Sequence, residues 1–376
     1  MTAGPFKLAY RRLVMFSTRQ RRVINLVNFA SSLRAQNPVK WWGQRYLDLA
    51  YLMLRWGSLT PLYYAQEMHK RGTRVSHQFI PYPIFRSQRN ACNSANAGSA
   101  EAIAILLDKQ RFHKHFSGTD IPIPETLLEI ADCPLPDAVE AGRAALHSNA
   151  PHEQGVTRLF FKPAAGIKGL GNFTVRTTAD GFSTEGESNN GQQTLLRGRW
   201  IIQKQIRQAE EIGRLHPNSL NTLRVITHRD HLGETHLLLA YLRVGMDGHV
   251  VDNSSGGGIA VPVDPATGRL GKTGLLLAGE HAQRITRHPT TALPFGAFTV
   301  PDIGKALEMA IKAHRSFSCL HTVGWDIAPG ESGPILLEGN DDWGGVALMW
   351  MVPRFEKVFR TVFLNRELNG TQFSET

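Results

Sequence analysis

The segment HTVGWDIAPGESGPILLEGN, residues 321–340, constrains the fold more than any other part of this sequence. It holds two short apolar runs, VGWDIA and PILLEGN, which are rich in residues that favour strands and are separated by the turn-forming run PGESG. A hairpin folded about position 332 places Asp326 opposite Glu338. Asn340 lies two residues beyond Glu338 and points to the same face, because strand side chains alternate.

This pairing of carboxylates indicates a cation-binding site. Directly opposed strand residues have Cβ atoms about 4.5–5.5 Å apart, and two like charges that close are unfavourable unless a cation lies between them. Two carboxylates and an amide oxygen suit Mg²⁺, a hard cation that prefers oxygen ligands and often shares them with substrate phosphates. The alternative is an ordinary hairpin whose carboxylates face water, and the segment alone does not decide between the two.

Length and composition describe a globular protein of two or three domains. The chain has 376 residues, of which 42% are hydrophobic and 20% are charged. Its three cysteines show no CxxC spacing, which argues against a disulfide scaffold or a structural zinc site and favours a reducing, cytoplasmic compartment. No uncharged apolar run reaches the roughly 18 residues of a transmembrane helix, and the N-terminus lacks the apolar stretch of a signal peptide.

The net charge of +10 is concentrated in the first 75 residues, which hold 13 Lys or Arg against Asp48 and Glu67. Residues 5–36 combine seven of these cations with many apolar residues, as amphipathic helices do, and Trp41-Trp42 follow. Such helices suit peripheral contact with an anionic membrane, at its inner face, or with a phosphate-rich partner. The alternative is a helical cap that packs its apolar side on the main domain. No nucleic-acid partner is expected.

A glycine-rich loop lies within RLFFKPAAGIKGLGNFTVR, residues 158–176. A strand ending in Lys162 leads into the loop Gly166 to Gly171, which contains Lys168, and a second strand follows at once. Because the loop joins strand to strand, it fits neither the dinucleotide fingerprint nor a Walker loop, both of which open a helix. It is either a hairpin lid over a triphosphate, with Lys162 and Lys168 as counter-charges, or a plain glycine-rich hairpin.

Periodicity and Gly/Pro punctuation predict the remaining elements. Residues 80–84 have the pattern of an extended connection, and one helix is expected from Ser99, its N-cap, to about Phe116. Residues 183–198 are expected to form an exposed loop. Strands are expected over 200–206, 221–227 and 235–244, and helices within 134–155, over 303–317 and beyond about residue 352.

The order of these parts resembles the ATP-grasp superfamily, over roughly residues 90–350. The closer resemblance is to the sugar-transfer-associated ATP-grasp group, related to α-L-glutamate ligases, and rests on NTLRV, DNSSGGG, GWDIA and LLEGN. It implies an α+β fold in which two α+β subdomains clasp ATP, with an N-terminal helical extension. The implied segments are a basic helical region 1–80, an N-terminal or linker subdomain 81–157, a glycine-lid subdomain 158–206, a C-terminal subdomain 207–352 and a terminal helix and tail 353–376.

The resemblance also implies the nucleotide-binding residues. Lys109 and Lys162 would contact the ATP phosphates. The glycine loop would close over them through Gly166, Lys168, Gly169 and Gly171. The adenine would lie against a segment that includes Gln203, Lys204 and Ile206, and Glu210 would bind the ribose hydroxyls.

The metal and substrate residues follow from the same resemblance. One or two Mg²⁺ ions bridging the phosphates would be bound by Asp326, Glu338 and Asn340. The acceptor or the triphosphate would be contacted by Asn253, Ser255, Gly256 and Gly257, unless that segment is only a turn.

Two positions depart from the pattern of related ligases. The adenine segment often begins with Glu, and here it begins with Gln203. An arginine that holds the acyl-phosphate often lies two residues before the metal-binding Asp, and here that position is Gly324. Arg224, on the Asn-Thr-Leu-Arg strand, is the candidate replacement.

The implied activity is that of an ATP- and Mg²⁺-dependent carboxylate–amine ligase. Phosphoryl transfer to a substrate carboxylate gives an acyl-phosphate, which an amine converts to an amide, with Lys162 and Arg224 as catalytic residues. The acceptor is a small molecule, glycan or peptide, in cell-surface polysaccharide or peptide-like metabolite biosynthesis. Two alternatives remain open: an ATP-grasp kinase acting on a small molecule or sugar, and a non-catalytic nucleotide-binding adaptor at the membrane.

Overall fold

The structure is a computed structural model that describes residues 39–56, 63, 68–71, 80, 82–149, 157–165, 171–178, 181–185, 195–246, 258–278, 281–352 and 355–364. These residues fall into two compact units, the larger drawn from residues 90–279 and 283–343 and the smaller from the rest. No helix in the described ranges is long and apolar enough to cross a membrane. The amphipathic helices expected over residues 5–36 lie outside these ranges.

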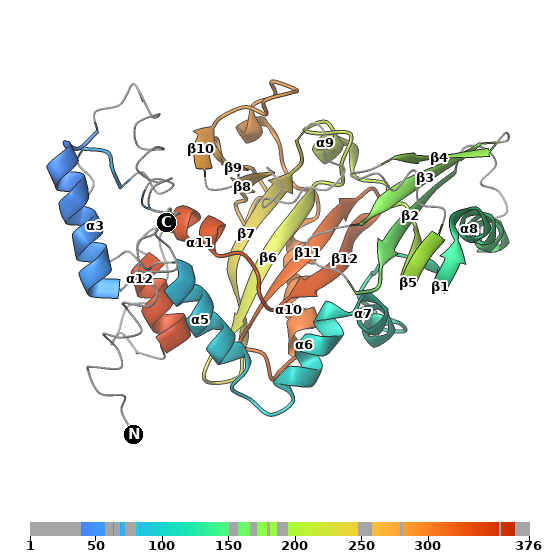
Figure 1. Cartoon of the computed structure of the whole chain (residues 1–376), viewed down its shortest axis with the longest axis horizontal. Coiled ribbons are helices and arrows are strands. Elements are labelled where there is room, and N and C mark those ends of the chain that lie inside the picture. Colours follow the sequence, from blue (N-terminus) through green and yellow to red (C-terminus); the bar gives the residue numbers. More distant parts are fainter. Residues whose placement is uncertain are drawn as a thin grey trace. The chain divides into compact units, whose positions relative to one another are not determined.

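The first sheet of the larger unit has five antiparallel strands in the order β1–β5–β2–β3–β4 (Figure 1). The strands are β1 (Thr126–Pro134), β2 (Thr157–Pro163), β3 (Phe173–Thr178), β4 (Gly181–Glu185) and β5 (Leu195–Lys204). Helix α8 (Leu135–Asn149) packs on one face, against Leu159, Phe161 and Ile202 among others. Because side chains alternate, Lys162 and Gln203 belong to the opposite face. The sheet takes strands from both sides of the boundary expected at residue 157.

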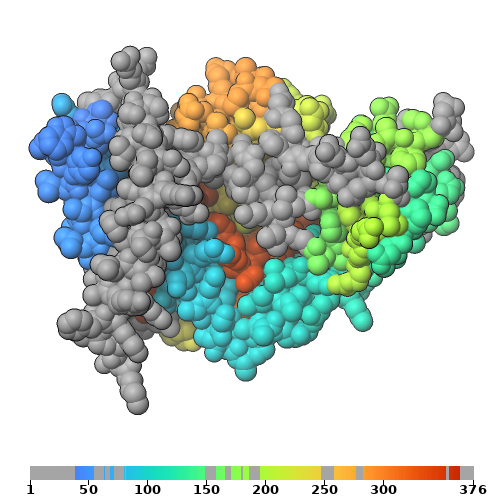
Figure 2. All heavy atoms as spheres, viewed as in Figure 1, coloured from blue at the N-terminus to red at the C-terminus, as the bar shows by residue number. Residues whose placement is uncertain are grey.

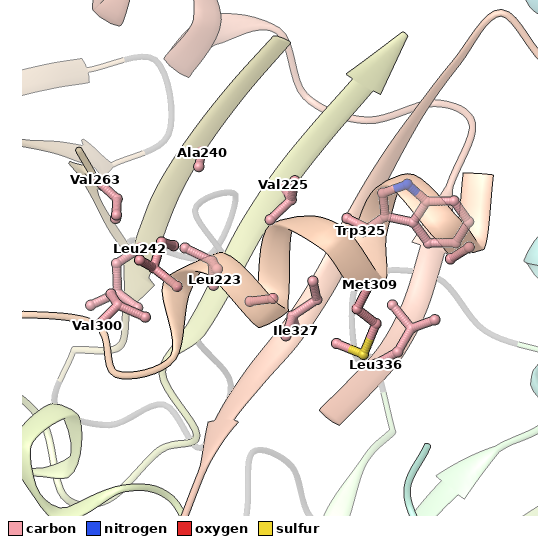
Figure 3. Packing of buried hydrophobic residues seen from close by; sticks show 14 of the residues in the cluster. Leu223, Val225, Ala240, Leu242, Val263, Val300, Met309, Trp325, Ile327 and Leu336 are labelled. Carbon is pink, nitrogen blue, oxygen red and sulfur yellow. The ribbon is translucent and has the colours of Figure 1, made fainter. Parts of the chain in front are cut away.

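The second sheet has seven strands in the order β10–β9–β8–β7–β6–β11–β12. The strands are β6 (Thr222–Arg229), β7 (Thr235–Val244), β8 (Ile259–Pro262), β9 (Gly274–Ala278), β10 (His281–Ile285), β11 (Thr322–Gly330) and β12 (Gly333–Asn340). Helix α10 (Ile303–Arg315) covers one face with Met309 and its neighbours (Figure 3). The sheet contributes Leu223, Val225, Leu242, Trp325, Ile327 and Leu336 to that core.

The β11–β12 hairpin confirms the expected opposition of Asp326 and Glu338, although its turn differs from the expected one. Pro329, Gly330 and Gly333 belong to the strands, so the turn consists of two residues and its register alone would place Leu337 opposite Asp326. A register shift at Leu337 moves Glu338 into that position. The extra residue also lets Leu336 enter the core while Glu338 points to the opposite face.

The single helix expected over residues 99–116 is wrong. Two helices form, α6 (Ser99–Leu107) and α7 (Lys109–Phe116), because Asp108 adopts an extended conformation between them. The Asp108 carboxylate accepts hydrogen bonds from the backbone N–H groups of Gln110 and Arg111, at 3.0 and 3.1 Å, and so caps α7. Ser99 is not an N-cap either: its hydroxyl donates to the Cys319 carbonyl, and Gly98 precedes α6.

Two further expectations are corrected. The segment 80–84 is not an extended connection, because α5 (Tyr82–Asn93) begins within it. Its proline at position 83 lies in the first turn, where a missing N–H breaks no helical hydrogen bond. The loop expected over 183–198 is interrupted by the ends of β4 and β5, which pair with β3 and β1.

The smaller unit contains α3 (Trp42–Trp56), most of α5, α11 (Val346–Met351), α12 (Phe355–Val358) and the π-helical turn η4 (Phe359–Phe363). Phe85 of α5 forms its centre, with ring centroids 5.6 Å from Phe355 and 5.3 Å from Phe363. Helical structure beyond residue 352 was expected, and α12 with η4 confirms it.

The register shift at Leu337 can be tested with adjacent substitutions. Leu336 is fully buried in the α10 core, so Leu336→Ala should lower the free energy of unfolding by about 2–5 kcal/mol. Leu337→Ala should cost about 1 kcal/mol or less, because Leu337 is only half-buried. Urea denaturation measures both, and equal losses would contradict a register in which Leu336, and not Leu337, packs in the core.

Candidate functional site

A row of four charged side chains crosses four adjacent strands of the larger sheet, on the face opposite α10. In spatial order they are Arg243 of β7, Arg224 of β6, Asp326 of β11 and Glu338 of β12. Both arginines are 7% exposed and Asp326 is 1% exposed. Because isolated charges are costly to bury, these side chains need partners of opposite charge.

Asp326 is bound by both arginines. Arg224 donates to both of its carboxylate oxygens, with an Nη2–Oδ2 distance of 3.0 Å. The Arg243 Nη2 atom lies 3.1 Å from the same Oδ2, and its Nε donates to the Thr222 hydroxyl at 2.9 Å. Burial alone would raise the pKa of Asp326, but the two guanidinium groups hold it below its ordinary value. Asp326 is therefore ionised at neutral pH.

Glu338 behaves in the opposite way. Burial, the negative charge of Asp326 and a hydrogen bond between the two carboxyl groups raise the pKa of Glu338. Asn340 donates from Nδ2 to Glu338 Oε1 at 3.3 Å, which confirms that Glu338 and Asn340 share a face. A cation bound between Asp326 and Glu338 would relieve this repulsion.

Two lysines approach Glu338 from other elements. Burial lowers the pKa of Lys162, at the end of β2, to about 8; the charge of Glu338 opposes this shift and that of Lys109 adds to it. Burial also lowers the pKa of Lys109, against the charges of Glu338 and Asp108. Lys162 belongs to the five-stranded sheet and Lys109 begins α7, so the site joins both sheets and a helix start.

Asp108 positions Lys109. Besides capping α7, its carboxylate forms an ion pair with Arg199 of β5. The backbone N–H of Lys109 donates to the Ala164 carbonyl at 3.0 Å, just beyond β2. The start of α7 is thereby tied to two strands of the smaller sheet, which brings Lys109 and Lys162 to the same carboxylate.

The segment expected to line the adenine begins in the last two residues of β5, and the residues just after it run along the hairpin tip. Ala209 donates to the Pro329 carbonyl at 2.8 Å, and Glu331 donates to the Arg207 carbonyl at 3.0 Å. The Gln203 side chain donates from Nε2 to the Thr126 hydroxyl at 3.0 Å, and Gln203 pairs with Thr126 of β1 and Phe160 of β2 in the sheet. Lys204 and Ile206 are half-buried.

Glu210 and Glu211 open helix α9 (Glu210–Gly213) but differ in their contacts. The Glu211 carboxylate accepts a hydrogen bond from the Thr299 N–H at 2.9 Å. Glu210 is exposed. Its carboxylate is therefore accessible to a ligand.

Several expected site residues lie outside the described part of the chain: Gly166, Lys168, Gly169, Asn253, Ser255, Gly256 and Gly257. Gly171 is described and has a φ of 83°, in the left-handed region that favours glycine. A Cβ there would also lie 3.2 Å from the Pro163 ring. Gly171 therefore shapes the return of the chain into β3, beside the strand that ends near Lys162.

Sequence reasoning assigned no role to Arg243 or His113. Arg243 interrupts the apolar strand LLLAYLRV, and an arginine in such a strand is a usable signal of a buried ion pair. His113 follows Lys109 by one helical turn; burial lowers its pKa, Glu129 opposes this shift and Lys162 adds to it. Their positions depend on contacts between distant segments.

The donor set fits an anion accompanied by Mg²⁺. Four cationic side chains, Lys109, Lys162, Arg224 and Arg243, surround two carboxyl groups, an excess that suits phosphates. In the described ranges no group of three or more His, Cys, Asp or Glu could hold a metal alone. Glu338 and Asn340 supply oxygen ligands, and Asp326 is already occupied by arginines. An ion here would share its ligands with a nucleotide, as Mg²⁺ usually does.

These two sheets, with their charged residues converging on one site, define the ATP-grasp fold. Figure 2 shows orange-red atoms of the β11–β12 region recessed between the turquoise α6–α7 segment and the green strands of the smaller sheet. The chain belongs to the sugar-transfer-associated ATP-grasp family, whose model matches residues 89–354.

Solved structures resemble the chain only distantly. N5-carboxyaminoimidazole ribonucleotide synthetase from Thermotoga maritima is 11% identical, with 78% of this chain and 58% of that chain covered and a TM-score of 0.39. The biotin carboxylase domain of Hydrogenobacter thermophilus 2-oxoglutarate carboxylase, solved with MgADP, is 13% identical, with 78% of this chain and 54% of that chain covered and a TM-score of 0.41. D-alanyl-alanine synthetase A from Vibrio cholerae is 12% identical, with 69% of this chain and 60% of that chain covered and a TM-score of 0.38. The chain thus spans less than two thirds of each, and no curated protein sequence matches it.

Lys162 should destabilise the free protein at neutral pH. Its fall in pKa from 10.5 to about 8 corresponds to about 3 kcal/mol against the charged form. Lys162→Met should therefore raise the free energy of unfolding at pH 7, by up to that amount. Because the folded-state pKa lies below the unfolded one, wild-type stability should rise with pH between about 8 and 10.5, and the variant should lack this rise.

Urea denaturation at pH 7 and pH 10 measures this effect, with Lys204→Met as the matched control from the neighbouring strand. A Lys162→Met variant that is less stable than wild type at pH 7 would contradict the cost assigned to the buried charge.

Gly324 has no room for a larger side chain. A Cβ there would lie 2.6 Å from the Cβ of Trp343, which is 1% exposed. Gly324→Ala should therefore reduce stability by about 1–3 kcal/mol. Gly304→Ala, in α10 where a Cβ meets nothing within 4 Å, should be neutral or stabilising by about 0.5–1 kcal/mol. Thermal denaturation that ranks the two variants the other way would refute this account.

Proposed function

We propose that this protein is an ATP- and Mg²⁺-dependent carboxylate–amine ligase that acts through an acyl-phosphate. The observation that carries the proposal is the row of Arg243, Arg224, Asp326 and the half-buried Glu338, with Lys109 and Lys162 beside Glu338. It combines a cationic excess for phosphates with oxygen ligands for a hard cation. Family membership supports a nucleotide-dependent reaction and, through its name, a link to sugar transfer.

The two ends of the row suit different ligands. Lys109 and Lys162 lie by Glu338 and Asn340, so the nucleotide phosphates and Mg²⁺ belong at that end. When bound, Mg²⁺ neutralises phosphate charge. Arg224 and Arg243 lie at the other end, where planar guanidinium groups suit a carboxylate or an acyl-phosphate. Asp326 holds both arginines in place and so links the two ends.

The reaction places bond changes between these groups. A carboxylate oxygen of the substrate attacks the γ-phosphorus of ATP, the bond to the β-phosphate oxygen breaks, and ADP leaves. An amine nitrogen then attacks the acyl carbon, phosphate leaves, and the amine gives up its proton. The lysines and arginines stabilise the negative charge that develops on the transferred group.

The nucleotide contacts follow the chain. The backbone after Gln203, together with Lys204 and Ile206, would line the adenine, and Glu210 would bind the ribose. The loop residues Gly166, Lys168, Gly169 and Gly171 would contact the phosphates, and Asn253, Ser255, Gly256 and Gly257 the acceptor. We place the acceptor among glycans or peptide-like molecules of the cell surface, and the protein in the cytoplasm.

ATP turnover by carboxyl variants tests the proposal. Wild-type protein with ATP and Mg²⁺ is supplied with carboxylic acids and amines, and ADP release and amide formation are measured. Asp326→Asn and Glu338→Gln should each lower turnover by about 100-fold or more. Glu331→Gln, an exposed residue at the tip of the same hairpin, should leave turnover unchanged.

Three outcomes would reject parts of the proposal. Full turnover in Asp326→Asn and Glu338→Gln would reject the assigned site. A phosphorylated product that accumulates without amide formation would identify a kinase instead of a ligase. Nucleotide binding without turnover of any acid would favour a non-catalytic adaptor.

A further inference from the structure

Helix α3 exposes an apolar surface that the described fold does not use. Five large apolar side chains at or just before this helix are more than half exposed: Trp41 at 53%, Trp42 at 66%, Tyr46 at 59%, Leu47 at 68% and Leu54 at 79%. Single exposed apolar residues are ordinary, but a contiguous apolar patch marks an interaction site. We call these five residues the α3 surface.

The α3 surface is a continuous stripe. Trp42, Tyr46, Ala50 and Leu54 follow one another at intervals of four, which places them along one face of the helix. Leu47 precedes Leu54 by seven residues, or two helical turns, and so lies on the same side of the helix as Leu54. The charged residues of α3 are Arg45, Asp48 and Arg55, and none falls within this spacing.

The other side of α3 makes contacts within the smaller unit, to which the helix belongs. Leu52 is fully buried. The Asp48 carboxylate accepts hydrogen bonds from Lys40 Nζ at 2.7 Å and from the Tyr63 hydroxyl at 2.6 Å. These contacts hold the helix without help from the stripe, so the stripe is not required for its attachment.

The aromatic end of the stripe is tightly arranged. The Trp41 and Trp42 rings meet edge to face at 5.4 Å, and Trp42 meets Tyr46 in the same manner at 6.1 Å. A Cβ on Gly43 would lie 2.1 Å from the Trp41 ring, so glycine allows that ring to fold over the backbone. Three aromatic rings with polar N–H or O–H groups thus gather at one exposed end, as is typical of side chains at a membrane–water interface.

Two basic residues contact Val39, which precedes Trp41 by two positions. The Arg71 side chain donates from Nε to the Val39 carbonyl at 3.2 Å, and Val39 pairs with Lys70. The first 75 residues hold 13 Lys or Arg against two acidic residues. Such an excess attracts anionic lipids and repels a second copy of the same segment.

We propose that the α3 surface lies on an anionic phospholipid bilayer, with Trp41, Trp42 and Tyr46 among the headgroups. A linear uncharged stripe matches a flat apolar boundary, and the excess of Lys and Arg in this part of the sequence matches anionic headgroups. The inference is independent of the nucleotide site, since it concerns other residues in a different unit. It would place the enzyme beside acceptors that are attached to a membrane.

Co-sedimentation with vesicles tests the proposal. The whole chain, without nucleotide, is mixed with vesicles of phosphatidylcholine alone or with phosphatidylserine, at low and at high salt. Wild type should bind the anionic vesicles, and high salt should weaken that binding. The combined variant Trp42→Ser, Tyr46→Ser and Leu54→Ser should have an affinity for these vesicles that is lower by about tenfold or more. Leu232→Ser removes a side chain that is 75% exposed on the β6–β7 turn, and should bind as wild type does.

A second measurement does not depend on the folding of the combined variant. Brominated phosphatidylcholine in the anionic vesicles should quench wild-type tryptophan fluorescence, and Trp42→Phe should reduce the quenched fraction. Three results would overturn the proposal: no binding to anionic vesicles, equal binding by the combined variant, or a wild-type dimer that the combined variant converts to monomers. The last result would assign the α3 surface to a second copy of the chain.

Discussion

The rest of the site depends on the two ion pairs that the buried Asp326 forms with Arg224 and Arg243. A carboxylate at 1% exposure is unfavourable unless its charge and its lone pairs are satisfied. Both guanidinium groups come from strands that lie next to each other, so their placement requires the pairing of β7, β6 and β11 in one register. Removal of Asp326 leaves two buried guanidinium groups without their counter-ion, which is more costly than the intact set.

The two sheets make this arrangement possible because each has one apolar and one polar face. Helix α10 covers the apolar face of the larger sheet and α8 that of the smaller one, so the charged faces are free to meet. Lys162 and Lys109 thereby reach Glu338 from different elements. The result is a cluster of cationic side chains around two carboxyl groups, which is the arrangement that the proposed phosphoryl transfer needs for positioning and charge stabilisation.

The hairpin shows how a correct expectation can rest on an incomplete reason. Symmetry about position 332 pairs Asp326 with Glu338. The actual two-residue turn would instead pair Asp326 with Leu337, and the register shift at Leu337 brings Glu338 opposite Asp326. Alternation alone cannot predict such a shift, because it arises where Leu336 must enter the core while Glu338 must reach the site. Similarly, the break at Asp108 follows from bonds to α7 and to Arg199, a residue of a distant strand.

By itself, the sequence determined the ATP-grasp family, the order of most strands, the opposed carboxylates and the lysines, because alternation, turn residues and motif spacing are local properties. Only the tertiary structure decided that Arg224 and Arg243 share Asp326, that Gly324 must stay small beneath Trp343, and that α3 turns an apolar stripe outward. Each of these depends on contacts between residues far apart in the chain or on which face is left uncovered. Local pattern does not contain that information.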